Sequence, residues 1–147
     1  MHKETIKKAE DIVASRTVKN RTYRGEICVL TLIDNKGYPY STTITAGKSE
    51  GIKKIWFGTT AESNKLKYIA TNNKASVCFS SETYSISLIG NVMVVDLTDT
   101  IKNEIWYDGL DWANSSKVII FETNKYNIFI TDDNSKTSRI LNGEFNL

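Results

Sequence analysis

Histidine is nearly absent from this chain of 147 residues, which contains only His2. Catalytic triads and dyads use histidine as their base, and many zinc sites use several histidines as ligands. His2 follows Met1 directly, in a position where chain ends usually fray. The sequence therefore argues against a Ser-His-Asp or Cys-His catalytic group, and we expect no bound metal.

Cysteine is also scarce, with Cys28 and Cys78 as the only two. Both lie in apolar runs, and neither has neighbours that would complete a zinc site. Cysteine packs as a small hydrophobic residue, and disulfides are rare in cytosolic proteins. We therefore expect two buried structural thiols.

Long apolar runs and a strong net charge are missing as well. No segment approaches the length that spans a bilayer, and the N-terminus is too polar and acidic for a secretory signal. The net charge is +2, with lysines and arginines scattered among acidic residues. A nucleic-acid binder usually carries a concentrated basic patch. The sequence predicts a cytoplasmic protein with neither a membrane nor a nucleic acid as its partner.

The residues that are present indicate mostly strands. Segment 26–34 is apolar at odd and even positions, which is typical of a strand buried on two faces. The turn signal 35–37 and the β-branched segment 38–46 then predict a hairpin. Further strands are predicted at 53–59, 75–80, 85–95, 118–121 and 126–131. Gly90 fits a bulge or a close backbone approach inside one of them.

Three helices complete the predicted elements. The apolar residues of segment 3–15 recur at helical spacing, within an N-terminal unit of residues 1–18. Ser63 precedes a helix expected to bury Leu66, Ile69 and Ala70, and Thr98 can cap a short helix. Segment 48–51 is expected to be a loop, and 132–147 a C-terminal tail.

The element order contains no regular alternation of strands and helices. Six or seven strands with two or three helices, and no linker rich in proline or glycine, predict one mainly antiparallel barrel over residues 1–147.

The segment Trp56-Phe57-Gly58-Thr59-Thr60-Ala61-Glu62-Ser63-Asn64-Lys65 carries the most chemical information. A strand end runs through a hydroxyl-rich turn into a helix with an early lysine. Unpaired N–H groups and the positive dipole end make a helix start a ready anion site, and a phosphate suits these donors. The alternative is a plain helix cap, with Ser63 as the N-cap and Lys65 in solvent. No complete Walker or dinucleotide glycine pattern is present.

Four segments, taken in order, resemble the pattern of one family. They are Gly37-Tyr38-Pro39, the turn 56–65, the segment Asn72-Asn73-Lys74-Ala75-Ser76-Val77, and a long strand with Gly90 and Asp96. They are similar to the pyridoxamine 5'-phosphate oxidase-like split barrels, in particular the short general stress protein branch. The resemblance covers roughly residues 20–131. It implies a six-stranded antiparallel split barrel with flanking helices, a homodimer, and FMN in two clefts at the dimer interface.

The resemblance also implies cofactor-binding residues. Thr59, Thr60, Ser63 and Lys65 match the phosphate-binding turn of the family, and Asn64 matches a position that is often basic. The strand that runs along the flavin ring in the family is matched by Ser41, Thr42, Thr43 and Ile44.

Three more positions follow from the same resemblance. Phe57 would lie near the ribityl chain, and Ser85 matches a glutamine that reaches the flavin in the oxidases. Trp106 matches an aromatic residue that lines the cleft from the partner subunit. From the residues alone, Trp56 favours the core and Trp106 fits either the core or the cleft. Thr42 and Thr43 also fit plain strand positions. Asp108 and Asp111 fit a solvated loop, with a catalytic role as the less favoured alternative.

Departures from the family pattern restrict the function. The oxidases carry an arginine that holds the FMN phosphate at the position of Thr42, and a lysine at the position of Gly47, whereas this chain has neither. The C-terminal arginine-x-histidine segment that binds the pyridoxal substrate is absent, as is the histidine of haem-degrading relatives. The sequence therefore predicts weaker FMN binding and argues against a vitamin B6 oxidase.

Two functions remain on these grounds. One is an FMN-dependent oxidoreductase acting on an unknown small substrate, because the flavin itself supplies the chemistry and demands few catalytic side chains. The other is a non-catalytic flavin-binding stress-response protein. A deazaflavin or another phosphorylated ligand in the same cleft stays open.

Overall fold

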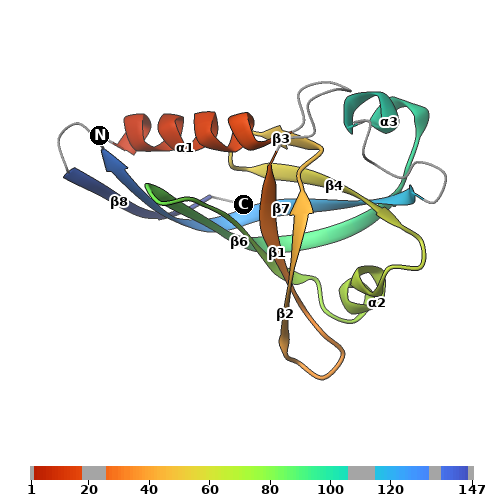
Figure 1. Ribbon diagram of the computed structural model, residues 1–147. Coiled ribbons are helices and arrows are strands. Elements are labelled where there is room, and N and C mark those ends of the chain that lie inside the picture. Colours follow the sequence, from red (N-terminus) through yellow and green to blue (C-terminus); the bar gives the residue numbers. More distant parts are fainter. Residues whose placement is uncertain (1, 18–25, 106–114, 133–136, 146–147) are drawn as a thin grey trace.

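The computed structural model describes residues 2–17, 26–105, 115–132 and 137–145. One antiparallel sheet carries the helices, with α1 above it, α2 beside the hairpin of β1 and β2, and α3 at one end (Figure 1). The helices are α1 (His2–Arg16), α2 (Asn64–Thr71) and α3 (Asp99–Ile105). The strands are β1 (Ile27–Ile33), β2 (Pro39–Thr45), β3 (Lys48–Glu50), β4 (Lys54–Thr60), β5 (Lys74–Ser80), β6 (Tyr84–Asp96), β7 (Ser115–Asp132) and β8 (Thr137–Glu144).

The strand order explains how the sheet closes. It runs β2-β1-β5-β6-β7-β4-β3, with β8 paired to β7. Its two ends, β2 and β3, are consecutive in the chain and are joined by the buried residues Ala46 and Gly47. The Gly47 N–H donates to the Trp56 carbonyl of β4 at 2.8 Å. Beyond this bond β2 pairs with β1 and β4 with β7, so the two strands diverge. The predicted split barrel is thus confirmed.

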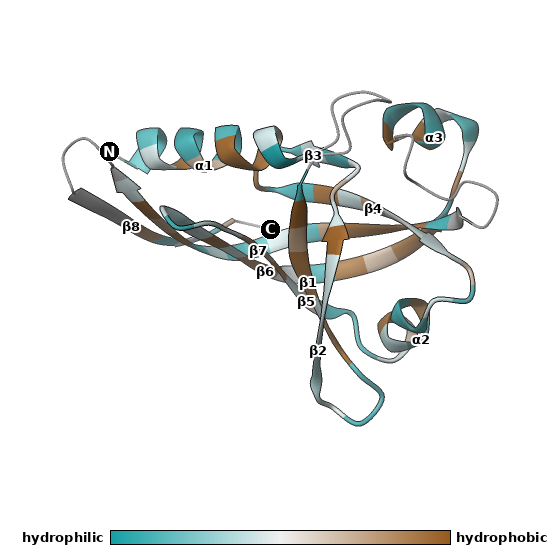
Figure 2. Cartoon of the chain, in the orientation of Figure 1, coloured by the Kyte–Doolittle hydropathy of each residue, from teal (hydrophilic) through white to brown (hydrophobic). Residues whose placement is uncertain are grey.

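The main core lies on the inner face of this sheet. Its strand residues alternate along β1, β5 and β6 as the pleat requires, and α1 adds the fully buried Ala9 and Val13. Figure 2 shows hydrophobic residues along β1, β4 and β6, whereas the tip of the β1–β2 hairpin is hydrophilic. The largest fully buried side chains include Phe57, Phe79, Phe121, Leu30, Leu32, Ile86 and Leu88.

Strand β7 is continuous, so the predicted division into 118–121 and 126–131 was wrong. Ile89 pairs with Lys125 and Gly90 with Thr123, which leaves Asn124 as one extra residue in β7. This bulge moves the buried positions from odd to even numbers along the strand. On the inner face the buried positions are Ile119, Phe121 and Thr123 before it, and Tyr126, Ile128 and Ile130 after it, whereas the buried Val118 belongs to a second cluster on the other face.

Two further strands lie where none was predicted. Segment 48–51 contains the short β3, which pairs with β4. The expected tail 132–147 contains β8, which pairs with β7 and buries Leu141. The described residues therefore form eight strands rather than six or seven.

Three predictions about burial also differ from the structure. In β1 one face is buried, but Val29, Thr31 and Ile33 on the other face are only half-buried. In α2 only Ile69 is buried, and Ala70 is exposed. Cys28 is buried as expected, whereas Cys78 is half-exposed.

Candidate functional site

The mouth of the split barrel lies where β2 and β4 diverge. At the end of β4 the chain turns into α2, which comes back towards the hairpin. The rings of Tyr68 on α2 and Tyr40 on β2 meet edge to face, with 5.2 Å between their centroids. The β4–α2 turn and β2 therefore form two sides of one mouth.

The turn has the local structure of a capped helix. Pairing of β4 with β7 slips between Thr59 and Thr60, and the Thr60 carbonyl accepts from Ser63 N–H at 3.2 Å. Ser63 is the N-cap of α2, and its hydroxyl oxygen accepts from Lys65 N–H at 3.2 Å. The predicted cap is confirmed. The same geometry leaves the Ser63 hydroxyl proton available to a ligand, because the cap uses only the oxygen as acceptor.

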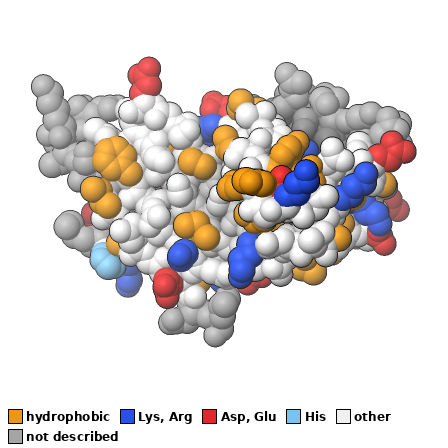
Figure 3. All heavy atoms as spheres, turned by 90° about the horizontal axis from the view of Figure 1, so that it is seen from below, with side chains coloured by type: hydrophobic (Ala, Val, Ile, Leu, Met, Phe, Trp, Pro, Cys, Tyr) orange, Lys and Arg blue, Asp and Glu red, His pale blue; other side chains and the backbone are white. Residues whose placement is uncertain are grey.

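Lys65 has the electrostatics of an anion site. Its side chain is half-buried, and this burial lowers the pKa of the amino group below 10.5, its ordinary value. Over the described part of the chain, no carboxylate forms an ion pair with it. Tyr68 lies three residues further along α2 and thus on the same side of the helix. On the face seen in Figure 3, Lys and Arg side chains lie beside hydrophobic ones in the half that holds α2 and β2.

Strand β2 presents an open edge to this mouth. Asp34 N–H donates to the Tyr38 carbonyl at 2.8 Å, and antiparallel pairing alternates from there along the strand. The backbone groups of Ser41 and Thr43 therefore point away from β1. Thr42 and Ile44 are half-buried on the inner side, whereas the Ser41 and Thr43 side chains are exposed.

Glycine at position 47 has a structural reason. A Cβ there would lie 2.8 Å from the Ile105 Cβ, because α3 packs directly against this backbone. A lysine, which the oxidases carry at this position, would require α3 to move. The region around Thr42 thus has neither of the two basic residues of the oxidases.

Not every predicted residue joins the mouth. The Phe57 side chain is fully buried in the main core and does not open into the mouth, so its predicted place near the ribityl chain stays a prediction. Asn64 is exposed at the start of α2. Ser85 lies on β6, three strands from β2, which corresponds to roughly 14 Å at the usual strand spacing. Trp106, with Asp108 and Asp111, lies outside the described residues. Trp56 packs with Ile105 and Val118 in a second apolar cluster, as expected of a core residue.

Tyr40 and Tyr68 were not among the predicted site residues. A weak signal for both exists in the sequence. Tyr40 alternates with Thr42 and Ile44 on one face of β2, and Tyr68 follows Lys65 at helical spacing. Their contact joins two segments that the sequence alone does not place side by side.

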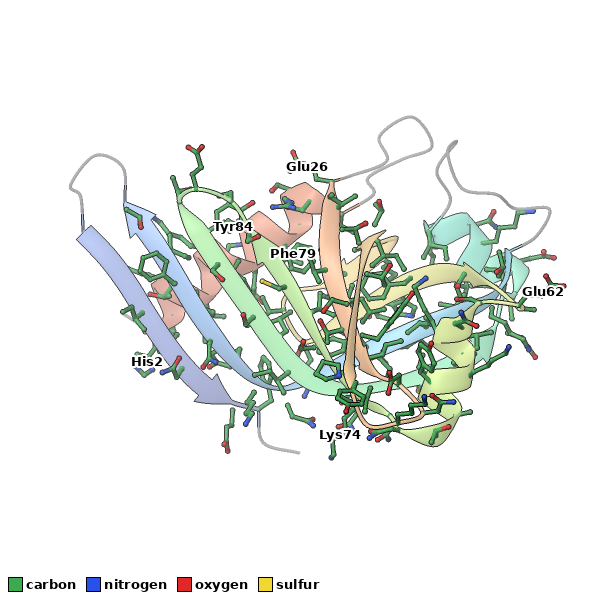
Figure 4. All side chains as sticks on the ribbon, turned by 60° about the horizontal axis from the view of Figure 1, so that its bottom comes forward. His2, Glu26, Glu62, Lys74, Phe79 and Tyr84 are labelled. Carbon is green, nitrogen blue, oxygen red and sulfur yellow. The ribbon has the colours of Figure 1, made fainter. Side chains whose placement is uncertain are left out.

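Two further features of the molecule concern possible metal ligands and the single histidine. Within 2–17, 26–105, 115–132 and 137–145, no group of three or more His, Cys, Asp or Glu side chains is placed to hold a metal ion. Figure 4 shows His2 at the opposite end of the molecule from Glu62 in the β4–α2 turn. None of the described helices is both long and apolar enough to traverse a bilayer.

The fold and the mouth define a split barrel whose opening is flanked by a capped helix and a half-buried lysine. A family model described as pyridoxamine 5'-phosphate oxidase like matches residues 14–117, more than half of the chain. The chain belongs to this family. No curated protein matches its sequence.

Solved structures share the fold at low sequence identity. A protein related to general stress protein 26, from Clostridium acetobutylicum, is 16% identical with a TM-score of 0.70, over 96% of either chain. A heme binding protein from Mycobacterium smegmatis is 14% identical with a TM-score of 0.66, over 95% of this chain and 57% of that one. A pyridoxamine 5'-phosphate oxidase-related, FMN binding protein from Nostoc punctiforme is 10% identical with a TM-score of 0.55, over 97% and 95%. At these identities the likeness establishes the fold.

Proposed function

We propose that this protein binds FMN as a cytoplasmic homodimer and acts as a flavin-dependent oxidoreductase on a small substrate. Lys65 carries the proposal. A half-buried ammonium group without a described carboxylate partner is costly to keep charged, and a phosphate would offset that cost. The Ser63 and Thr60 hydroxyls lie in the same turn, as neutral donors.

The residues of the mouth suit the different parts of FMN. Lys65, Ser63, Thr59 and Thr60 would hold the phosphate. The outward backbone groups of Ser41 and Thr43 would pair with the polar edge of the ring. When bound, the flavin supplies hydride or single-electron transfer, and the protein supplies position and electrostatics. We favour a flavin over haem because the single histidine, His2, lies far from the turn.

The homodimer is proposed from the outer face of the sheet, which consists of the strand side chains that point away from the main core. Its central row crosses six strands without a charge, through Thr43, Val29, Cys78, Ser87, Asn127 and Asn142. Phe129 and Ile140, paired on β7 and β8, are exposed in the neighbouring row, and Ile27 is exposed at the start of β1. A second copy seated on this face would cover them. It would also bring Ser85 near a mouth that its own subunit does not place within reach.

A vitamin B6 oxidase is not proposed, because the basic residues at 42 and 47 and the substrate-binding C-terminal motif are absent. The same losses favour a second candidate, a non-catalytic flavin-binding stress-response protein. Anaerobic mixing of the FMN-loaded protein with NADH or NADPH separates the two. Rapid bleaching of the flavin absorbance supports the oxidoreductase, and no reduction by either donor supports the binder.

Lys65→Ala tests the phosphate site. The change removes a charge and little core packing, so the fold should persist while FMN affinity falls. The expected loss is about 1.5–3 kcal/mol, the range for a hydrogen bond to a charged group, or roughly ten- to a hundredfold in Kd. Riboflavin, which has no phosphate, should bind equally to both proteins. Quenching of flavin fluorescence measures each Kd.

Lys67→Ala is the matched control. Lys67 is exposed on the same helix, two residues beyond Lys65. Its replacement should leave the affinities for FMN and for riboflavin unchanged. Equal losses for FMN and riboflavin in Lys65→Ala would place the phosphate elsewhere. Unchanged fluorescence of FMN with the parent protein at high micromolar concentration would reject flavin binding altogether.

A further inference from the structure

A small cavity lies on the outer side of the sheet, at the last turn of α1. Its volume is about 170 Å³, and its lining includes Arg16, Ile27, Val29, Thr43, Cys78 and Ser80. Pockets for cofactors and drug-sized ligands are usually 300–1,000 Å³, whereas a cavity near 150 Å³ holds benzene. The cavity therefore suits a molecule of about six heavy atoms and is too small for a flavin.

Arg16 brings a buried positive charge to this cavity. Only 8% of the residue is exposed. Its Nη1 donates to the Ser80 carbonyl and to the Tyr84 hydroxyl, both at 2.8 Å, and its Nη2 donates to the Ile27 carbonyl. The aromatic rings of Phe79 and Tyr84 lie 5.9 Å from the guanidinium carbon. These neutral partners hold the guanidinium in one orientation without cancelling its charge.

The countercharge of Arg16 is incomplete. Among the described residues, its one ion pair is with Glu26, whose Oε2 lies 3.2 Å from Nε. The Glu26 side chain is 63% exposed, so water screens it. Although this Glu26 oxygen is close enough for an ion pair, it does not meet the geometry of a hydrogen bond. Arg16 Nε is therefore a buried donor without a hydrogen bond within the described part of the chain. Figure 4 shows Glu26, Phe79 and Tyr84 around the end of α1.

A buried cation normally has a partner that is buried with it, and an unsatisfied buried donor calls for an explanation. An oxyanion in the cavity would supply a buried countercharge for the guanidinium and a hydrogen-bond acceptor for its unsatisfied donor. The apolar side chains of Ile27 and Val29 would contact a short carbon chain, and Thr43 would add a hydroxyl.

We propose that this cavity is a binding site for a small organic carboxylate of two to four carbons. Thr43 belongs both to the cavity and to the open edge of β2, so the two sites adjoin. The functional meaning rests on the proposed flavin function, because an anion held here would lie beside the flavin ring. The substrate class would then be small carboxylic acids.

Propionate tests the site in the FMN-free protein, with propionamide as the neutral molecule of the same shape. Nitrogen-15 NMR should show saturable shifts at the Ile27 and Ser80 amides and at the Arg16 Nε–H. Propionate should bind at least about tenfold more tightly than propionamide, the factor that one charge-assisted contact gives. Equal shifts from both compounds, or none, would overturn the proposal.

Cys78→Leu fills the cavity while leaving every partner of Arg16 in place. Because Cys78 also lies in the central row of the proposed interface, binding is compared only after light scattering shows that the variant keeps the oligomeric state of the parent. It should weaken propionate binding by about tenfold or more. Ser76→Leu is the matched control, since Ser76 shares the strand and the face of Cys78 but does not line the cavity. Retained binding in Cys78→Leu, or equal loss in both variants, would contradict the assignment.

FMN titrations of the same samples separate this inference from the flavin proposal. If FMN binds and propionate does not, the carboxylate site is wrong and the flavin function stands. If propionate binds at Arg16 and FMN does not, the carboxylate site stands and the flavin function is wrong.

Discussion

Gly90 lies opposite the bulge of β7, where two backbones approach closely. A Cβ at this position would overlap the carbonyl oxygen of Glu122. Asn124, the extra residue of the bulge, donates from its amide to Asn91 Oδ1 at 2.6 Å, and Asn91 donates in turn to Asn73. The bulge thus depends on a glycine at position 90 and on the hydrogen-bonded side chains of Asn124, Asn91 and Asn73, which connect β7 to β6.

Gly90→Ala should therefore destabilise the fold. Forcing a methyl group into a packed site typically costs about 1–3 kcal/mol, and backbone on the other side leaves little room for relaxation. The midpoint of urea unfolding measures the loss. Gly37→Asn is the control, because Gly37 has a φ of 87° with nothing within 4 Å, and Asn tolerates such a backbone. An unchanged midpoint for Gly90→Ala would mean that β6 and β7 can separate at no cost.

Lys65 should make FMN binding depend on pH. Burial lowers its pKa, so it loses its proton at a lower pH than an exposed lysine does. The phosphate requires the charged form, and FMN affinity should therefore fall as pH rises through this lowered pKa. Without ligand the sign is opposite: stability rises with pH up to 10.5, because the unfolded chain keeps its proton longer.

Fluorescence titrations from about pH 7 to about pH 10 measure this effect, within the range where a lysine of lowered pKa titrates. Riboflavin is the control, since its ring titrates like that of FMN but it has no phosphate. A parallel pH dependence of the two affinities would show that Lys65 does not face the phosphate.

At the scale of elements, the sequence was informative where the pattern is local. Helical spacing predicted α1, the turn 35–37 predicted the hairpin, and Ser63 predicted the start of α2. The sequence predicts two strands in place of β7 because the bulge moves the apolar residues from odd to even positions. Such a change of pattern is typical of two strands with a gap between them. β3 has only three residues, and the residues of β8 show no clear alternation. Antiparallel pairing with the neighbouring strands β4 and β7 makes these segments strands, which their own residue patterns do not indicate.

The candidate site divides in the same way. Lys65 and its cap follow from local sequence. The Tyr40–Tyr68 contact depends on how α2 returns to β2, and Arg16 depends on where α1 ends against the sheet. The burial of Phe57 follows from strand parity rather than from its closeness to the turn, because parity decides which face of β4 its side chain occupies.

Removing β8 should destabilise the barrel. A chain that ends after Asp132 loses the β7–β8 ladder and the buried Leu141. Loss of one buried leucine side chain alone costs about 2–5 kcal/mol. The urea midpoint should drop clearly, whereas a chain shortened by residues 146–147 should match the parent. Equal midpoints for all three chains would show that β8 is dispensable.

At the scale of the whole molecule, the homodimer proposed above rests on the uncharged central row of the outer face. Ser87 lies in its central row, between Cys78 and Asn127. Ser87→Arg would bury a charge without a partner in the proposed interface, which strongly disfavours association. The parent should be a dimer by light scattering, and the variant a monomer with weakened FMN binding.

Ala14→Arg places the same charge on the exposed side of α1 and should leave the dimer intact. A parent protein that remains monomeric at about 100 μM, well above ordinary micromolar dimer constants, would reject the homodimer.

Pro39, the only proline of the chain, stands at the first position of β2. By the alternation of that strand, its nitrogen points to the open edge, where an incoming strand from another molecule would seek a donor. A proline offers none, and it is one of the devices by which exposed edges resist aggregation. The exposed Tyr38 and Tyr40 on either side would otherwise make this edge prone to aggregation. The mouth therefore stays accessible to a small ligand while it discourages the addition of a foreign β-strand.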